Sequence, residues 1–352
     1  MFSSNRFIQL ICVIMGLLFI SIDVAIGQTR EKPNVLFIAV DDLKPMIGAY
    51  GHDQIQTPQM DKLASEGVTF MNNHTQQAVC GPSRASLLTG WRPDKTKIWR
   101  LNVMIRDKNP DVVTLPQHFK NNDYITAGIG KIFDKRSVDK DHDKRSWSLS
   151  YRENMPDFYL EEYGEPFVHY QSTEVKKKAQ KYMEEAEMEG LNGWERKAYA
   201  MERIKPSTEM LDVPDEAYLD GLLAKRGQEL LEQLSENEKP FFLGIGFKKP
   251  HLPFVAPKKY WDLYNRDDIS LSKWQKHSQN GPDLAYHRFG ELRSYTDIPP
   301  AIGDDGLVNR EKQKELIHGY MATVSYIDTQ VGKLMDKLDK LGLRENTIVV
   351  LW

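Results

Sequence analysis

The chain has 352 residues, of which 40% are hydrophobic and 28% are charged, and its formal net charge at pH 7 is −3. This balance is ordinary for a folded globular protein, and it points neither to nucleic acid nor to a strongly acidic partner. The length suits one large α/β domain or two small ones. The sequence contains no internal repeat and no low-complexity run.

Residues 1–27 have the pattern of a secretory signal peptide. Arg6 precedes an almost wholly apolar run over residues 7–22, and small residues before Gln28 form a cleavage site. An uncleaved anchor is the alternative, because the apolar stretch is nearly long enough to span a bilayer. The sequence favours cleavage, and so predicts a secreted or periplasmic protein with a mature domain at 28–352 and no stable membrane insertion.

Cys80 is the one cysteine that remains after cleavage, because Cys12 lies in the leader. A secreted chain with one thiol has no partner for an internal disulfide, which leaves a buried small hydrophobe or a functional group. Gly81 and Pro82 predict a turn after it, and residues 85–88 predict a helix. A reactive side chain at a helix N-terminus suits anionic chemistry.

Two adjacent carboxylates end the first predicted strand. Residues 33–40 are a continuous apolar run, as in a parallel strand buried on both faces, and Asp41 and Asp42 follow it. Ligand sites in open α/β sheets lie outside the carboxyl ends of the strands. The pair therefore predicts a site for a hard cation such as Ca²⁺ or Mg²⁺, and an Asp pair that only caps a turn is the alternative.

The rest of the chain alternates helical and strand patterns. Residues 57–67 predict a short helix that Thr57 caps and Gly67 ends. Further helices are predicted at 115–121, 175–190, 222–234 and 319–341, and further strands at 124–129, 240–247 and 346–352. This alternation predicts an α/β fold with a mostly parallel central sheet and helices on both faces.

Polar residues also follow two of these strands. Lys131 comes after the second strand, and Lys249 and His251 come after the third. A lone lysine is usually solvated and a lone histidine usually structural. Their repeated position at strand ends, with a proline on each side of His251, favours a functional site shared with Asp41.

Several of these stretches resemble the type I sulfatases. Residues 80–90 contain Cys-x-Pro-Ser-Arg followed by Thr89-Gly90, which resembles the family signature, and the Lys-Pro-His-x-Pro around His251 resembles the iduronate-2-sulfatase type. The resemblance extends over nearly all of residues 33–352. It implies the alkaline-phosphatase-like fold and hydrolysis of sulfuric esters on a sulfated glycan.

The resemblance also implies how the site works. Cys80 would be oxidised to formylglycine by a formylglycine-generating enzyme or another maturase, and its hydrated form would attack the sulfur. Asp41, Asp42 and the modified Cys80 would be ligands of Ca²⁺, with Mg²⁺ as the alternative. Arg84 would steady the hydrated residue and the oxygens that face the metal through charge-assisted hydrogen bonds.

The remaining implied roles concern the sulfate. Lys131 and His251 would bind it and stabilise the developing charge, and Lys249 would add positive charge. Relatives place a histidine three residues after the lysine, whereas this chain has Asp134, an anion that would repel a sulfate. Either another residue such as the nearby His142 fills that role, or the site is weakened or retuned.

The family pattern continues beyond the last predicted strand. In sulfatases an Asp-His or Asp-Asn pair follows it and completes the metal site, and a further lysine and a smaller C-terminal subdomain come later. The resemblance therefore predicts that residues 28–352 are the N-terminal portion of a sulfatase catalytic domain, with the C-terminal part missing. Two alternatives stay open: a catalytically incomplete remnant that binds anionic glycans, and a phosphatase or phosphodiesterase of the same superfamily.

Overall fold

The structure, a computed structural model, describes residues 32–156, 159–287, 289–299 and 307–352. Asn34–Trp352 forms one unit, within which all the elements below lie. The predicted signal peptide at residues 1–27 lies outside the described residues. In the part of the chain that is described, no helix combines the length and the apolar character needed to cross a membrane.

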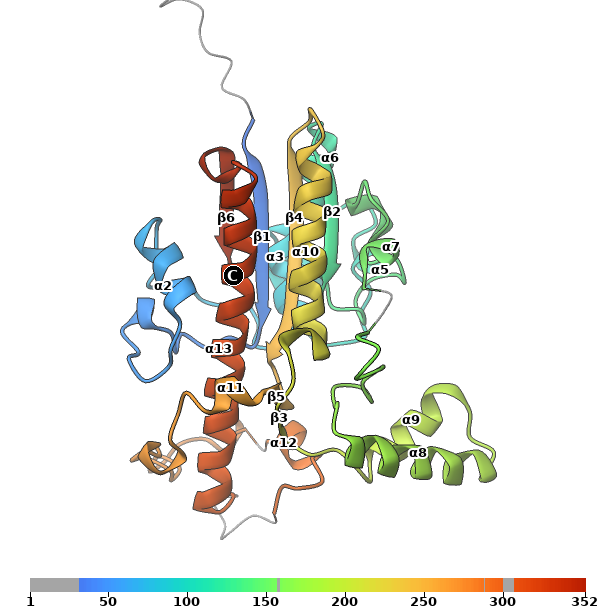
Figure 1. Ribbon diagram of the computed structural model, residues 1–352, viewed down its shortest axis with the longest axis vertical. Coiled ribbons are helices and arrows are strands. Elements are labelled where there is room, and N and C mark those ends of the chain that lie inside the picture. Colours follow the sequence, from blue (N-terminus) through green and yellow to red (C-terminus); the bar gives the residue numbers. More distant parts are fainter. Residues whose placement is uncertain (1–31, 157–158, 288, 300–306) are drawn as a thin grey trace, which may run out of the picture. The chain divides into compact units, whose positions relative to one another are not determined.

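The predicted parallel sheet is confirmed. It consists of β1 (Asn34–Asp41), β2 (Ile125–Gly130), β4 (Phe241–Pro250) and β6 (Thr347–Leu351), all parallel, in the order β2-β4-β1-β6 (Figure 1). β1 is central and buried along its whole length, as its continuous apolar run requires. The parallel strands bring their carboxyl ends to one edge of the sheet, where Asp41 lies.

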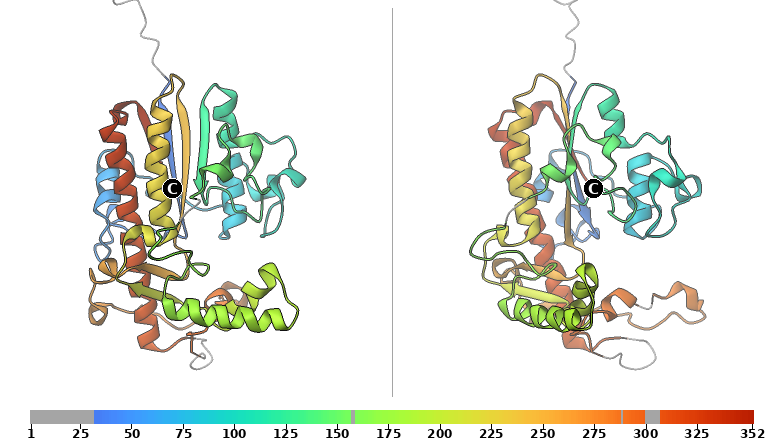
Figure 2. Two further views of the ribbon diagram at one scale, coloured as in Figure 1. Left: turned by 45° about the vertical axis from the view of Figure 1, so that its right-hand side comes forward. Right: turned by 90° about the vertical axis from the view of Figure 1, so that its right-hand side faces the viewer.

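Helices cover both faces of this sheet, as predicted (Figure 2). α10 (Leu219–Ser235) and α13 (Arg310–Lys340) lie on one face, and α3 (Cys80–Thr89) and α6 (Leu115–Asn121) lie on the other. Successive β1 side chains serve opposite faces: Leu36 and Ile38 pack with α10 and α13, whereas Val35 and Phe37 pack with α3. The strand that carries Asp41 is therefore packed between two hydrophobic clusters, one on each face of the sheet.

The other elements are shorter or lie outside the main sheet. β3 (Thr208–Leu211) and β5 (Phe254–Pro257) form a second, two-stranded parallel sheet. The further α-helices are α2 (Pro58–Ser65), α4 (Pro93–Thr96), α5 (Ile105–Lys108), α7 (Tyr151–Asn154), α8 (Thr173–Met188), α9 (Gly193–Met201), α11 (Lys258–Trp261) and α12 (Gly290–Arg293). Short 3₁₀ helices are η1 (Gly48–Tyr50), η2 (Lys144–Ser146), η3 (Asp215–Ala217), η4 (Arg266–Asp268), η5 (Asp283–Ala285) and η6 (Arg344–Asn346).

Helix α13 begins earlier than predicted. The apolar stripe indicated a start at residue 319, but the helix starts at Arg310. Asn309 caps it by accepting a hydrogen bond from Lys312 N at 2.8 Å. Lys312 then forms ion pairs of 2.7 Å with Asp297 and Glu315. Polar contacts rather than apolar periodicity stabilise these first turns, so the hydrophobic pattern did not reveal them.

The N-terminus of α2 is capped differently from the prediction. The Thr57 hydroxyl bonds a carboxylate within the helix instead of the first-turn N–H groups. The N–H groups of Gln59 and Met60 donate to the Asp328 carboxylate on α13, at 3.1 and 2.8 Å from Oδ1. Thr57 is the N-cap residue, as predicted, but its side chain makes no capping hydrogen bond. A buried carboxylate 268 residues beyond Met60 accepts from these donors instead.

This distant cap makes stability depend on pH. Asp328 is 2% exposed, and burial raises its pKa from 3.8 to about 6. Between these values the folded chain holds a proton that the unfolded chain has lost, so the free energy of unfolding falls as pH rises from about 4 to about 6. Asp328→Asn is expected to remove this component, which amounts to up to about 3 kcal/mol. Urea unfolding of both proteins at several pH values measures it, and parallel pH profiles would contradict it.

Candidate active site

Asp41 is the centre of a buried charge cluster at the end of β1. Its Oδ1 accepts a hydrogen bond from Arg84 Nη2 at 2.8 Å, and its Oδ2 accepts one from Lys131 Nζ. The side chains of Asp41 and Arg84 are 4% and 8% exposed. Burial alone would raise the pKa of Asp41, but the charges of Arg84 and Lys131 outweigh it and hold the pKa below its usual value. Asp41 is therefore ionised at neutral pH and binds two cationic side chains.

Helix α3 brings Arg84 and Cys80 to this edge. The helix begins at Cys80 itself. Gly81 and Pro82, which were predicted to form a separate turn before the helix, belong to its first turn. Proline is favoured in a first turn, because the N–H that it lacks would have no partner inside the helix. At the other end Gly90, with φ of 67°, donates its N–H to Ser86 O at 2.9 Å and ends the helix.

Arg84 and Lys131 both bind Asp41, and Arg84 also binds the backbone of the segment that carries Lys131. Arg84 Nη1 donates to the backbone carbonyls of Lys131 and Ile132, the latter at 3.0 Å. Gly130, with φ of 74°, ends β2 and turns Lys131 into this position. The structure thus joins Arg84 and Lys131 around Asp41, while the hydrogen bonds of Arg84 go to these groups and not to Cys80.

Cys80 lies beside a second ion pair. Arg136 Nη2 donates to its sulfur at 3.0 Å, and the same guanidinium binds Asp134 through Nε at 2.8 Å and Nη2 at 2.7 Å. Burial raises the pKa of the Cys80 thiol; Lys131 opposes the rise, and a hydrogen bond to Asp134 adds to it. An unmodified Cys80 is therefore a protonated thiol at neutral pH, which is a poor nucleophile.

Asp134 does not carry an uncompensated charge. It is 2% exposed, and the hydrogen bonds of Arg136 outweigh burial and hold its pKa well below its usual range. Lys131 Nζ lies 3.9 Å from Asp134 Oδ2 and links the pair to the Asp41 cluster. The alternative candidate His142 is engaged elsewhere, with its ring stacked on Tyr151 at a centroid distance of 4.2 Å.

His251 faces Asp42 on the other side of the β1 terminus. Asp42 has φ of 58°, so the chain turns sharply after Asp41 and directs the second carboxylate differently. His251 Nε2 lies 3.6 Å from Asp42 Oδ2 and 3.5 Å from Glu291 Oε1. His251 Nδ1 lies 2.7 Å from the carbonyl of Leu252, which can only accept, so Nδ1 carries a proton and Nε2 faces the carboxylates.

Lys249 holds the loop that carries His251. Its side chain is buried, and Nζ donates to the carbonyls of His251 at 2.6 Å and Pro253 at 2.8 Å. Burial lowers its pKa to about 8, against the attraction of Asp220. Asp220 in turn accepts from the backbone N–H groups of Lys248 at 2.7 Å and Lys249 at 3.2 Å. The ammonium of Lys249 thus donates to carbonyls of the loop that carries His251, and its contribution to substrate binding stays a prediction.

The carboxylates at the end of β1 fit a divalent cation only in part. Asp41 and Asp42 supply the oxygen ligands that Ca²⁺ and Mg²⁺ prefer. Among the side chains that the structure describes, no group of three His, Cys, Asp or Glu residues is close enough together to hold a metal ion. Both oxygens of Asp41 face cations and the sulfur of Cys80 faces Arg136. The pair can provide part of a coordination shell, and metal ligation by Cys80 stays a prediction.

Several residues that shape the site were given no role from the sequence. Arg136 had one weak signal, its position two residues after Asp134. Glu291 reaches His251 from α12, and nothing in its local sequence indicates this. Tyr320 accepts a hydrogen bond from Lys44 N at 2.8 Å and donates to the Asp42 carbonyl at 3.2 Å. These contacts join parts of the chain far apart in sequence, which residue patterns do not reveal.

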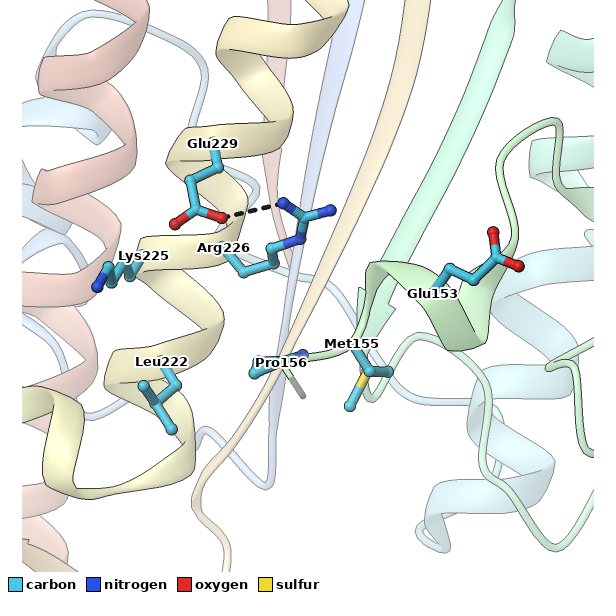
Figure 3. Close-up of a pocket in the computed structure, with 7 residues that line it drawn as sticks. All are labelled: Glu153, Met155, Pro156, Leu222, Lys225, Arg226 and Glu229. Atoms are coloured by element: carbon cyan, nitrogen blue, oxygen red, sulfur yellow. Dashed lines mark hydrogen bonds and ion pairs between the residues drawn. The ribbon is translucent and has the colours of Figure 1, made fainter. Parts of the chain in front are cut away.

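A surface pocket lies away from these residues (Figure 3). Its lining comes from α7, from the segment after it and from α10, and consists of Glu153, Met155, Pro156, Leu222, Lys225, Arg226 and Glu229. Arg226 Nη1 pairs with Glu229 there at 2.9 Å. The predicted site residues lie outside this lining, so the candidate active site is the charge cluster at the sheet edge.

Comparison with known proteins shows which sequences resemble this chain. Iduronate 2-sulfatase of Homo sapiens is 33% identical over 344 residues, which are 95% of this chain and 58% of that protein. A sulfatase of Formosa agariphila is 32% identical over 92% of this chain and 58% of its own length. The chain therefore spans a little over half the length of these two relatives.

Solved structures share the fold. The phosphonate monoester hydrolase of Agrobacterium radiobacter has a TM-score of 0.58 at 19% identity, over 91% of this chain and 62% of that one. A protein in complex with its substrate D-glucosamine-2-N,6-O-disulfate has a TM-score of 0.58 at 18% identity, over 91% and 65%. These likenesses confirm the predicted alkaline-phosphatase-like α/β fold. The model of the Sulfatase family matches residues 33–352, and the chain belongs to that family.

Proposed function

We propose that this chain is the catalytic portion of a secreted or periplasmic enzyme that removes sulfate from a sulfated glycan, in the manner of iduronate 2-sulfatase. One observation carries the proposal. Cys80 lies at the first position of α3, beside Arg136 and close to Lys131, where its own thiol is protonated. A site rich in fixed cations suits an anionic sulfate ester, and a poor thiol nucleophile suits a residue that acts only after oxidation.

Maturation of Cys80 is part of this proposal. A formylglycine-generating enzyme or another maturase would oxidise the thiol, and the hydrated aldehyde would then supply the hydroxyl that attacks sulfur. Arg136 is the side chain that donates to the residue at this position, while Asp134 accepts a hydrogen bond from it. These two side chains would therefore orient the modified residue.

A divalent cation would bind at the end of β1. Asp41 and Asp42 would hold it, and when bound the cation would neutralise sulfate oxygens and lower the pKa of the attacking group. Lys131 Nζ, which binds Asp41 and lies 3.9 Å from Asp134, would add a positive charge beside the sulfate. Ca²⁺ is the proposed ion, with Mg²⁺ as the alternative.

His251 would bind a sulfate oxygen or protonate the leaving alcohol. Its Nδ1 is committed to the Leu252 carbonyl, so Nε2 is the atom available for either task. His251→Gln is expected to lower kcat by about 100-fold, as the loss of one charge-stabilising donor does in other enzymes. Steady-state kinetics measures this, with the exposed His118→Gln on α6 as the control. Equal kcat values for the two variants would contradict the role.

The activity itself is tested with a panel of substrates. The protein, with formylglycine at position 80, would be offered a 2-O-sulfated uronate disaccharide, a 6-O-sulfated glucosamine, an aryl sulfate and a phosphate monoester. We expect the 2-O-sulfated disaccharide to give the highest kcat/KM. Preferential release of phosphate would instead support a phosphatase.

A further inference from the structure

Arg136 is the basic residue that contacts Cys80 directly. Its Nη2 donates to the sulfur at 3.0 Å. The family arginine, Arg84, instead directs its hydrogen bonds to Asp41 and to two backbone carbonyls. Lys131 Nζ is likewise held by Asp41. In the part of the chain that the structure describes, the cation aimed at residue 80 therefore comes from the loop after β2.

The guanidinium of Arg136 is presented in a fixed orientation. One of its edges, Nε and Nη2, binds both oxygens of Asp134 at 2.8 and 2.7 Å. Such a bidentate pair fixes the plane of the guanidinium. The second hydrogen of Nη2 belongs to the outer edge that it shares with Nη1, and this hydrogen points to the Cys80 sulfur. Among the described residues Nη1 has no hydrogen-bond partner, so the outer edge can bind two oxygens.

The charges of the cluster favour an anion at this edge. Asp134 alone would repel a sulfate, but Arg136 neutralises it, and Lys131 lies 3.9 Å away. The ion pairs of this cluster contain three cationic and two anionic side chains, so their formal charges sum to +1. The cations are Arg84, Lys131 and Arg136, and the anions are Asp41 and Asp134. The Arg136 side chain is 39% exposed, so a ligand can reach its outer edge from solvent.

We propose that Arg136 is a catalytic residue of this site, whose outer edge binds the oxygen carried by oxidised residue 80 together with an oxygen of the sulfate ester. Asp134 is the positioning residue that holds it there. The contact between Arg136 and the sulfate ester rests on the proposed function, whereas the contact between Arg136 and residue 80 does not. Asp134, which stands where the family pattern has a histidine, thus orients Arg136 toward Cys80.

The first test measures the charge at Cys80 without any activity. Unmodified protein is alkylated with anionic iodoacetate or neutral iodoacetamide, and mass spectrometry of the peptide that contains Cys80 gives both rates. Because both reagents react with the thiolate, the ratio of the rates cancels the thiolate fraction and reports the local charge. Arg136→Gln is expected to lower the iodoacetate-to-iodoacetamide ratio about 5-fold, the effect of one charge at about 4 Å in a water-like medium.

Two further variants keep this test decisive. Arg136→Lys retains the charge and should keep most of the ratio, which also guards against an effect of misfolding. Lys135→Gln removes one charge from the exposed neighbouring residue, and solvent screening should limit its effect to less than about 2-fold. If Arg136→Gln changes the ratio no more than Lys135→Gln does, the guanidinium does not act on residue 80 and the inference is wrong.

The second test is kinetic and uses protein with formylglycine at position 80. Arg136→Gln is expected to lower kcat about 100-fold with a smaller change in KM, because the donor acts on charge that develops during the reaction. Arg136→Lys should restore part of kcat, and Lys135→Gln should match the wild type. An active wild type with an equally active Arg136→Gln would overturn the inference alone. An inactive, fully converted wild type would overturn the proposed function, while the alkylation ratio still decides the place of Arg136.

Discussion

Cys80→Ala is expected to reduce sulfate-ester hydrolysis to the background rate, a loss of about 10⁴-fold or more. The reason is that alanine can neither be oxidised to formylglycine nor supply an attacking hydroxyl. Ion chromatography of released sulfate measures the loss with an aryl sulfate or a 2-O-sulfated disaccharide. Ser86→Ala is the matched control, because Ser86 lies buried on the same helix and its hydroxyl makes no hydrogen bond to the described residues.

The outcome also separates the candidate functions. Hydrolysis that persists in Cys80→Ala would exclude the formylglycine route. If that residual activity released phosphate, a phosphatase or phosphodiesterase of the same fold would be the better account. Loss of activity in Ser86→Ala as well would indicate damage to α3 rather than removal of the reactive residue.

Arg84→Met is expected to destabilise the folded chain by about 3–5 kcal/mol, the cost of removing one partner from a buried ion pair. The substitution would leave the Asp41 carboxylate buried with Lys131 alone, and the carbonyls of Lys131 and Ile132 would lose a donor. Urea unfolding followed by circular dichroism measures the free energy. Arg84→Lys should recover only part of it, because an ammonium cannot reproduce the planar fork.

An exposed ion pair provides the control for this effect. Lys178 and Glu174 lie 2.6 Å apart on α8, with side chains 54% and 74% exposed. Solvent screens such a pair, so Lys178→Met should leave the free energy of unfolding nearly unchanged. Similar losses in Lys178→Met and Arg84→Met would mean that the Asp41 cluster does not hold α3 against β1.

Much of the fold could be predicted because it depends on local patterns. The double-sided apolar runs that became β1 and β4 are readable directly, and parallel pairing follows from the helices between them. Features that depend on distant partners could not be predicted in this way. The cap of α2 is Asp328, 268 residues beyond Met60, and the start of α13 depends on ion pairs rather than on apolar spacing.

For the candidate active site, the positions of several residues could be predicted, but the contacts of their side chains could not. Strand ends and the family resemblance indicated Asp41, Lys131 and His251, and the structure places these residues at the carboxyl edge of the sheet. Directions of side chains could not be predicted. Lys249 turns into its own loop, because carbonyls there accept from its ammonium. Arg136 contacts Cys80 while Asp134 binds the same guanidinium, a geometry that spacing alone does not specify.

The most direct measurement of the central claim relates activity to the chemical state of residue 80. Preparations made with graded amounts of a formylglycine-generating enzyme would be analysed by mass spectrometry for their fraction of formylglycine and assayed for sulfate release. The account predicts a rate proportional to that fraction, with no activity when all of Cys80 is unmodified. A rate independent of the fraction, or no sulfate release from fully converted protein, would contradict it.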